Sequence, residues 1–440
     1  MKLKTMLLAI FIPVFTVALL ACSSTATTTT SSVSPSASAA TTSPSPSAIN
    51  KIKSLKVGMY AGSADPYYQL LHDTLQACAN DDTDCKWTVD FRVGPQSPDA
   101  QLQAAMDFLS ADYDALVFIQ DSAEATSKCI DKAKAARVPY FGAYSSFATS
   151  SNAKNAAGSC CYDFVQTGKY AGEQAVKSGA KKLIVVESQI NQGSTSDQTL
   201  GYLLAYQEAG KNLGGSTAQQ IAEQKSKAKQ DGKQEIKVVS WVSGGGTASS
   251  TQQAMAAAIK SLGPQGFDSV YVQSDAMMEG VIDAMKDANL DPSKYFLSAC
   301  GGTEKSLDWI KDGTIKCDVN LSAALEGDVL YQQIKAYFTG EKYRKYIHPY
   351  LTEFDASNID QVTGMLIPST DGKTYIAARK ANKFAHNISD SKFTDIEKMG
   401  VASASASASA KPSATASKPG ASPSPAASKP AAASPSASKK

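Results

Sequence analysis

The chain has 440 residues, with 43 basic and 41 acidic side chains and a formal net charge of +2 at pH 7. A balance this close argues against nucleic acid as the main partner, because such proteins carry an excess of basic charge. Both ends of the chain differ sharply in composition from its middle, which leaves roughly 340 residues for folded structure, enough for two domains of ordinary size.

The first 21 residues are predicted to be a secretory signal. Lys2 and Lys4 precede a short apolar run at 6–20, which is too short and too early to count as a transmembrane helix. The sequence Leu-Leu-Ala-Cys at 19–22 resembles the bacterial lipobox. That resemblance implies cleavage before Cys22 and attachment of lipid to it; the alternative is an ordinary signal peptide with an incidental cysteine. A lipid on Cys22 would anchor the protein to a membrane without spanning it.

Two low-complexity segments flank the middle of the chain. Residues 22–50 are almost entirely Ser, Thr, Pro and Ala, and residues 401–440 are Ala, Ser and Pro with lysine as the only charge. Such segments have too little apolar bulk to offset chain entropy, so we expect a disordered tether and a disordered tail. The composition of the tail fits contact with an anionic surface and fits attached sugars equally well.

Seven cysteines remain beyond Cys22, and in an oxidising compartment they are disulfide candidates. Cys78 and Cys85 enclose a short polar stretch and form one expected pair, and Cys300 and Cys317 form the other. Because seven is odd, at least one thiol stays free or pairs between molecules. A metal site is not expected, since no CxxC spacing occurs, and no cofactor is expected.

The first half of the middle region alternates short strands with helices. Asp65 followed by Pro66 is typical of a helix N-cap and the first helical position, and the continuous apolar run at 115–119 is typical of a strand covered on both faces. In chain order the predictions are a strand at 53–60, a helix at 66–79, a strand at 87–93, a helix from 98, a strand at 115–119, a helix at 122–137 and a strand at 138–143. Connections of this length predict a parallel sheet with right-handed crossovers.

The second half repeats the alternation. The predictions are a helix at 168–177, then a strand at 183–187, a helix at 199–213, a strand at 236–242, a helix at 250–262, a strand at 269–273, a helix at 277–288 and a strand at 295–299. The lysine-rich run at 225–237 is expected to be a solvated excursion. The two halves also contain similar sequences, DALVFIQD at 114–121 and DSVYVQSD at 268–275. The fold class predicted is therefore α/β, with two doubly wound parallel-sheet lobes.

Several stretches resemble type I periplasmic binding proteins of the sugar (ribose-type) class, the extracellular receptors of ABC importers. They are DPYY at 65–68, ALVFIQDSAEA at 115–125, GKYAG at 168–172, VYVQSDAMMEGVIDAMKDA at 270–288 and PYLTEFDASNI at 349–359. The resemblance implies two Rossmann-like lobes joined by a three-crossing hinge. The N-terminal lobe would hold 51–161 and 323–352, and the C-terminal lobe 162–322 and 353–362; residues 363–400 form an extension without a counterpart.

The resemblance also implies which residues touch a ligand. Asp65, Tyr67 and Tyr68 fall where the family places a polar group and two aromatics that stack on a sugar ring; the alternative is that one tyrosine fills the core. Charged residues usual in the family are replaced here by Tyr144, Gln198 and Gly301, which removes strong charge-assisted bonds to hydroxyls. The further candidates are Gln120, Asp163, Trp241, Ser274 and Asp275. Helix capping is an equally good explanation of Asp163 and Asp275.

The function expected is capture of a small neutral ligand, a sugar or polyol, by closure of two lobes, with delivery to an ABC permease. We expect a monomer, held at the membrane by its N-terminal lipid, with no enzymatic activity. The alternatives are a sensor that presents its closed form to a signalling kinase, and a binder of a nucleoside or other solute. The glycine-rich stretch SGGGTAS at 243–249 could cradle a phosphate, but it lacks the Walker lysine.

Overall fold

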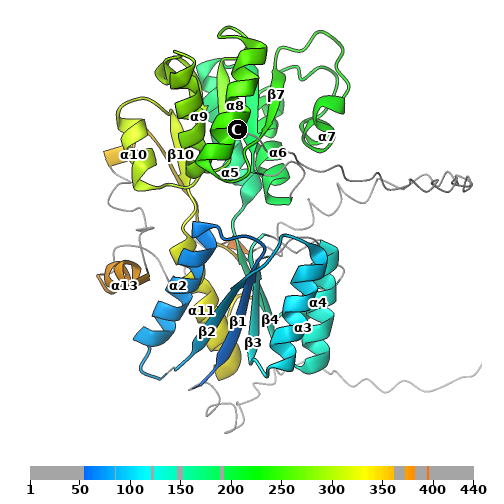
Figure 1. Cartoon of the computed structure of the whole chain (residues 1–440), viewed down its shortest axis with the longest axis vertical. Coiled ribbons are helices and arrows are strands. Elements are labelled where there is room, and N and C mark those ends of the chain that lie inside the picture. Colours follow the sequence, from blue (N-terminus) through cyan, green and yellow to red (C-terminus); the bar gives the residue numbers. More distant parts are fainter. Residues whose placement is uncertain are drawn as a thin grey trace, which may run out of the picture. The chain divides into compact units, whose positions relative to one another are not determined.

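The computed structural model describes residues 54–84, 86–119, 123–145, 152–188, 193–360, 372–381 and 394–395. The expected signal, Cys22, the tether and the tail lie outside these residues, as do Cys85 and Gln120. The described chain forms two sheets, of seven and six strands, with helices between consecutive strands (Figure 1). Most strand pairs are parallel, so the predicted α/β class with two doubly wound sheets is confirmed.

The first sheet has the strand order β13-β11-β5-β4-β3-β1-β2. Its strands are β1 (Lys56–Ala61), β2 (Thr88–Val93), β3 (Ala115–Ile119), β4 (Tyr140–Tyr144), β5 (Gly158–Cys161), β11 (Tyr346–His348) and β13 (Thr394–Asp395). All neighbours are parallel except β13, which runs antiparallel to β11. Every residue of β3 is buried, because helices cover both faces of the sheet.

Four helices accompany this sheet: α2 (Pro66–Asp81), α3 (Pro98–Ser110), α4 (Ala123–Ala136) and α11 (Ala323–Thr339), with a short turn η1 (Ala153–Asn155). Helix α2 packs against α11, and α3 packs against α4, so the sheet lies between two helical layers (Figure 1). Helix α2 starts as predicted, with the Asp65 carboxylate accepting the backbone N–H of Tyr67 and Pro66 at the first position.

The second sheet has the order β12-β10-β9-β8-β6-β7. Its strands are β6 (Lys182–Glu187), β7 (Lys237–Ser243), β8 (Ser269–Val272), β9 (Phe296–Ser298), β10 (Cys317–Asn320) and β12 (Thr352–Asp355), and only β12 is antiparallel to its neighbour. The helices are α5 (Phe164–Ser178), α6 (Gly193–Glu208), α7 (Ala218–Gln224), α8 (Ala248–Leu262), α9 (Asp275–Asp287) and α10 (Glu304–Lys311), with short turns η2 (Lys225–Lys227) and η3 (Pro292–Lys294).

Helices α5 and α6 approach each other closely at glycines. A Cβ on Gly168 would lie 1.9 Å from the carbonyl oxygen of Gln198, and a Cβ on Gly201 would lie 1.9 Å from that of Val165. No side chain fits there, because the obstacle on each side is backbone. The glycines therefore set the spacing of the two helices.

The lysine-rich run is not wholly solvated, contrary to expectation. The Lys225 side chain is only 10% exposed, and its ammonium lies 2.6 Å from Oε1 of the fully buried Glu187. It also lies 4.7 Å from the ring centre of Trp241. A buried carboxylate needs a partner of opposite charge, and the long α6–β7 connection supplies one.

The described chain passes between the sheets four times. It leaves the first sheet after β5, returns to it after β10, leaves it again between β11 and β12, and is back in it at β13. The resemblance implies the first three of these passages, and the fourth belongs to the C-terminal extension. The first sheet is thus completed by strands from distant parts of the sequence.

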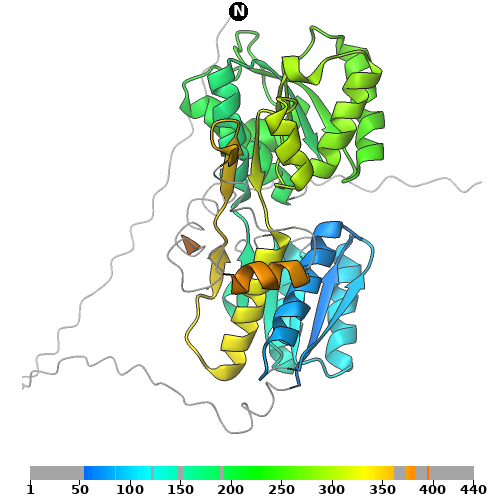
Figure 2. The same cartoon turned by 90° about the vertical axis from the view of Figure 1, so that its left-hand side faces the viewer.

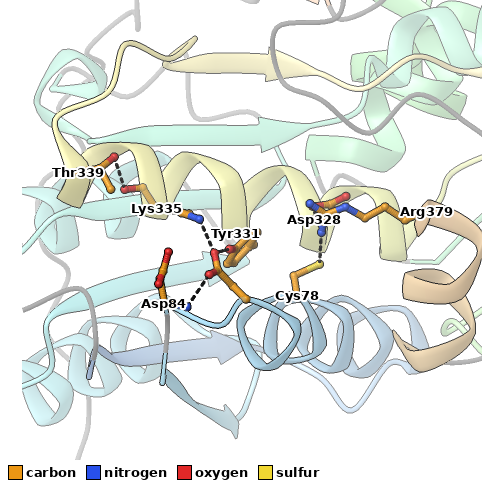
Figure 3. Close-up of polar contacts among 8 residues, drawn as sticks. Cys78, Asp84, Asp328, Tyr331, Lys335, Thr339 and Arg379 are labelled. Carbon is orange, nitrogen blue, oxygen red and sulfur yellow. Dashed lines mark hydrogen bonds and ion pairs between the residues drawn. The ribbon is translucent and has the colours of Figure 1, made fainter. Parts of the chain in front are cut away.

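Helix α13 (Gly372–Lys380), which belongs to the C-terminal extension, packs on α2 and reaches α11 (Figure 2). The fully buried carboxylate of Asp328 on α11 accepts the hydroxyl of Tyr375 at 2.8 Å and pairs with Arg379 at 3.3 Å. Figure 3 shows Arg379 reaching Asp328 beside Cys78. Farther along α11, Lys335 pairs with Asp82, the residue that follows α2.

The expected disulfide between Cys300 and Cys317 is not formed, and Cys85, the expected partner of Cys78, lies outside the described residues. Cys300 and Cys317 are buried free thiols. Cys317 pairs with Ser298 across the strands, so Cys300 lies two residues farther along. With about 3.3 Å per residue and about 4.8 Å between strands, their Cα atoms are roughly 8 Å apart, beyond the reach of a disulfide. Cys78 is also a buried free thiol, against Arg379.

Candidate functional site

Three tyrosines meet where β1 and β4 end. Tyr67 and Tyr68 come from the first turn of α2, and Tyr144 is the last residue of β4. Their ring centres are 5.2 Å (Tyr67–Tyr144), 5.4 Å (Tyr68–Tyr144) and 6.0 Å (Tyr67–Tyr68) apart, and each pair meets edge to face. We call these residues the tyrosine cluster. It lies at the carboxyl ends of parallel strands, where ligands of such sheets bind.

The three rings are not equivalent. Tyr68 is 8% exposed and belongs to the core of the first sheet, so the alternative of a core-filling tyrosine applies to it. Tyr67 and Tyr144 are only partly buried and contact the cores of both sheets. Tyr144 also packs on Phe164, the first residue of α5, at 5.0 Å. Tyr67 and Tyr144 are therefore the rings with accessible surface to offer a ligand.

Glu326 lies beneath this cluster and was not anticipated from the sequence. Its carboxylate is fully buried and accepts the Tyr67 hydroxyl at 2.7 Å and the Tyr144 backbone N–H at 2.5 Å. The second bond holds a residue whose φ of 63° is left-handed. Burial raises the pKa of Glu326 to about 7, although both hydrogen bonds act to lower it. The only sequence signal is an acid in the otherwise apolar first turn of α11.

Three acidic residues lie at or near the starts of α2, α5 and α6. Asp65 is half-buried, and burial raises its pKa against the opposing effect of the Tyr67 N–H bond. Asp163 caps α5 by accepting the N–H of Gln166 at 3.0 Å, as its capping interpretation predicts. Desolvation and repulsion from Asp163 raise the pKa of Asp197 to about 6, so these two carboxyls lie close enough for their charges to interact.

Most candidate side chains on the second sheet already bind or pack against other residues of the fold. Gln198 is 1% exposed. Its side-chain amide oxygen accepts hydrogen bonds from the Tyr271 hydroxyl at 3.0 Å and from the Cys300 thiol at 3.1 Å. Ser274 caps α9 through the N–H of Met277. Trp241 packs on the α5 and α6 side of the sheet under Lys225. Ligand contact by these residues stays a prediction.

Asp275 and Gly301 form a packed unit. Asp275 accepts the Thr303 N–H at 2.8 Å and the Thr303 hydroxyl at 2.7 Å, which fixes the start of α10. A Cβ on Gly301, whose φ is 150°, would lie 2.8 Å from the Asp275 carboxyl carbon. Burial and repulsion from Asp275 raise the pKa of Asp318.

The predicted ligand-binding residues thus have different roles in the two lobes. Asp65, Tyr67, Tyr68 and Tyr144 come together around Glu326, whereas Gln198, Ser274, Asp275 and Gly301 hold the second lobe's own structure. Two mostly parallel sheets, with several chain passages between them and polar and aromatic groups at the strand ends, define a two-lobe solute-binding protein.

The chain belongs to the periplasmic binding protein family, because the model of the periplasmic binding protein domain matches residues 57–342, more than half of its length. The resemblance to type I periplasmic binding proteins is thereby confirmed. The family consists of binding proteins, so the expectation that the chain is not an enzyme is confirmed at family level. No curated protein matches the sequence.

Solved structures share the fold. A galactofuranose-binding protein is 20% identical, with a TM-score of 0.59 over 70% of this chain and 96% of its own. The arabinose-binding component of an ABC transporter from Shewanella sp. ANA-3 is 18% identical, with a TM-score of 0.56 over 76% and 99%. The fructose-binding periplasmic domain of a hybrid two-component system is 13% identical, with a TM-score of 0.58 over 75% and 97%.

The family implies an extracytoplasmic location. Within the described ranges, none of the helices has both the length and the apolar character that a membrane span requires.

Proposed function

We propose that the chain is the solute receptor of an ABC importer and that it binds a sugar or polyol at the tyrosine cluster. The observation that carries this is the position of Tyr67 and Tyr144, which are partly accessible rings at the carboxyl ends of β1 and β4. A pyranose or furanose presents C–H groups on one face and hydroxyls at its edge, so flat rings suit the face. The carboxylate of Asp65, beside Tyr67, suits the hydroxyls.

The solved structures support this choice of ligand class. Those with the same fold include receptors described as binding galactofuranose, arabinofuranose and myo-inositol. On this proposal the two lobes close on the ligand by movement at the chain passages between the sheets, and the closed form is presented to the permease. The protein acts as a monomer.

A sensor role is the second candidate. One structure with this fold is the fructose-binding periplasmic domain of a hybrid two-component system. Ligand binding would be the same in both cases, and only the partner of the closed form would differ.

Thermal-shift measurements with L-arabinose, D-galactose, D-fructose and myo-inositol test the ligand class. At least one is expected to raise the melting temperature of the wild type, because a ligand that binds only the folded state stabilises it. Tyr67→Ala is expected to weaken that binding at least tenfold, since it removes the stacking ring. Tyr337→Ala, an exposed tyrosine on α11, is the matched control and should bind as the wild type does. Stabilisation by charged amino acids alone would contradict the proposal.

Lipid attachment at Cys22 completes the proposal. Cys22→Ser is expected to move the protein from the membrane fraction to the soluble fraction, because a tether alone has no affinity for lipid. Cell fractionation followed by intact-mass measurement checks this. An unmodified Cys22 in the mature wild type would show that the protein is not a lipoprotein.

A further inference from the structure

Glu326 connects three elements at the foot of the tyrosine cluster. It comes from α11 and binds the hydroxyl of Tyr67 on α2 and the backbone of Tyr144 at the end of β4. Its charge also raises the pKa of the side chains of Tyr144, of Cys160 on β5 and of Tyr162 just after that strand. Within the described part of the chain, the groups that shift its pKa include no cation.

The protonation state of Glu326 determines which partner donates in its hydrogen bond with Tyr67. An ionised carboxylate can only accept, so the Tyr67 hydroxyl must donate its single proton to Glu326. The Tyr67 oxygen then has only lone pairs left for any other partner. A protonated Glu326 has a proton of its own, which it can donate to the Tyr67 oxygen, and this leaves the Tyr67 proton free to turn elsewhere.

We propose that Glu326 is a specificity-determining residue, which sets whether Tyr67 accepts a hydrogen bond from the ligand or donates one to it. With Glu326 ionised, the ligand must present an O–H or N–H donor to Tyr67. With Glu326 protonated by a proton from solvent, the ligand can present an acceptor instead. The Tyr67 O–H bond only rotates and is not broken. The part that concerns the ligand rests on the proposed function, whereas the action of Glu326 on Tyr67 does not.

Both forms occur near neutral pH, because burial raises the pKa of Glu326 to about 7 from an ordinary value of 4.5. A carboxyl whose pKa is higher in the folded than in the unfolded state disfavours the folded protein when it ionises. Its contribution to stability is therefore largest below pH 4.5 and is lost as the pH rises to about 7. Glu326→Gln should abolish this loss, because glutamine does not titrate.

A measurement without ligand tests the action on Tyr67. In protein labelled with ¹³Cζ-tyrosine, the Tyr67 resonance, assigned with Tyr67→Phe, is expected to shift with pH, with its midpoint at about 7. The shift should be absent in Glu326→Gln. Asp328→Asn removes another buried carboxyl of α11 and is the matched control, in which the shift should persist. A Tyr67 resonance that does not move between pH 5 and 9, or that still moves in Glu326→Gln, would overturn the proposal.

The second measurement uses whichever of the four test sugars and polyols binds the wild type. Binding should be severalfold tighter at pH 8 than at pH 6, since an ionised Glu326 makes the Tyr67 oxygen a stronger acceptor. Glu326→Gln should remove this dependence, and Glu326→Ala should weaken binding about tenfold or more. Unchanged binding by Glu326→Ala would refute the specificity role but leave the receptor function standing. If none of the four binds, the ligand class is wrong, and the tyrosine resonance still decides the role of Glu326.

Discussion

Replacing Arg379 with methionine is expected to lower the free energy of unfolding by about 3 kcal/mol. Arg379 pairs with Asp328 at 3.3 Å, and the Asp328 side chain is fully buried. Methionine keeps much of the apolar stem but removes the charge, so the buried Asp328 carboxylate would lose this cation and keep its hydrogen bonds to Tyr375 and Gln332. Denaturant unfolding monitored by circular dichroism measures the change.

The double variant Asp328→Asn with Arg379→Met is the control for this experiment. It removes both charges, and Tyr375 can still donate to the amide oxygen. Its stability is expected to recover at least half of the loss, because the penalty comes from the unpaired charge and not from the missing contact. A single variant as stable as the wild type would show that α13 does not need this ion pair to stay in place.

Alanine at Gly168 is expected to destabilise the protein by more than about 3 kcal/mol, or to prevent folding. The added Cβ would meet the Gln198 carbonyl oxygen at 1.9 Å, and neither backbone can yield without separating α5 from α6. The reciprocal substitution Gly201→Ala meets the Val165 carbonyl oxygen at the same distance and should cost a similar amount. Thermal unfolding and soluble yield measure both.

Gly193→Ala provides the matched control. It also lies in α6, but nothing lies within 4 Å of its added Cβ. Alanine is the better helix former, so this change should be neutral or stabilising by up to about 1 kcal/mol. If Gly168→Ala melted like Gly193→Ala, the close approach of the two helices would not be a determinant of stability.

Much of the fold follows from local pattern. The strand at 115–119 and the helix that starts at Asp65-Pro66 both occur where the sequence predicts them. Helix α6 begins at Gly193, six residues before its predicted start at Thr199. Its first turns are glycine, serine and threonine, which are weak helix formers, so packing against α5 decides where it begins. Helix α7 was missed between the predicted helix at 199–213 and the lysine-rich run, although Thr217 and Gln220 form a capping box.

The resemblance named Tyr67, Tyr68 and Tyr144, which come together in the structure. Glu326 lies 259 residues beyond Tyr67, and no local signal joins them. Ligand contact by Gln198, which is buried on α6, stays a prediction. The prediction of a Cys300–Cys317 disulfide was wrong because strand register depends on long-range pairing, which residue spacing does not reveal.

The discontinuous first sheet bears on how the protein is made. Its strand β11 and helix α11 lie beyond residue 322, and α13, which supplies Arg379, lies beyond residue 371. A ribosome releases these segments late, when β1 to β5 have long been synthesised. Shortened translation products would expose the apolar faces that α11 covers and leave Tyr67 without its carboxylate. The arrangement makes completion of the polypeptide a condition for folding, so quality-control proteases should remove interrupted chains before a defective receptor accumulates.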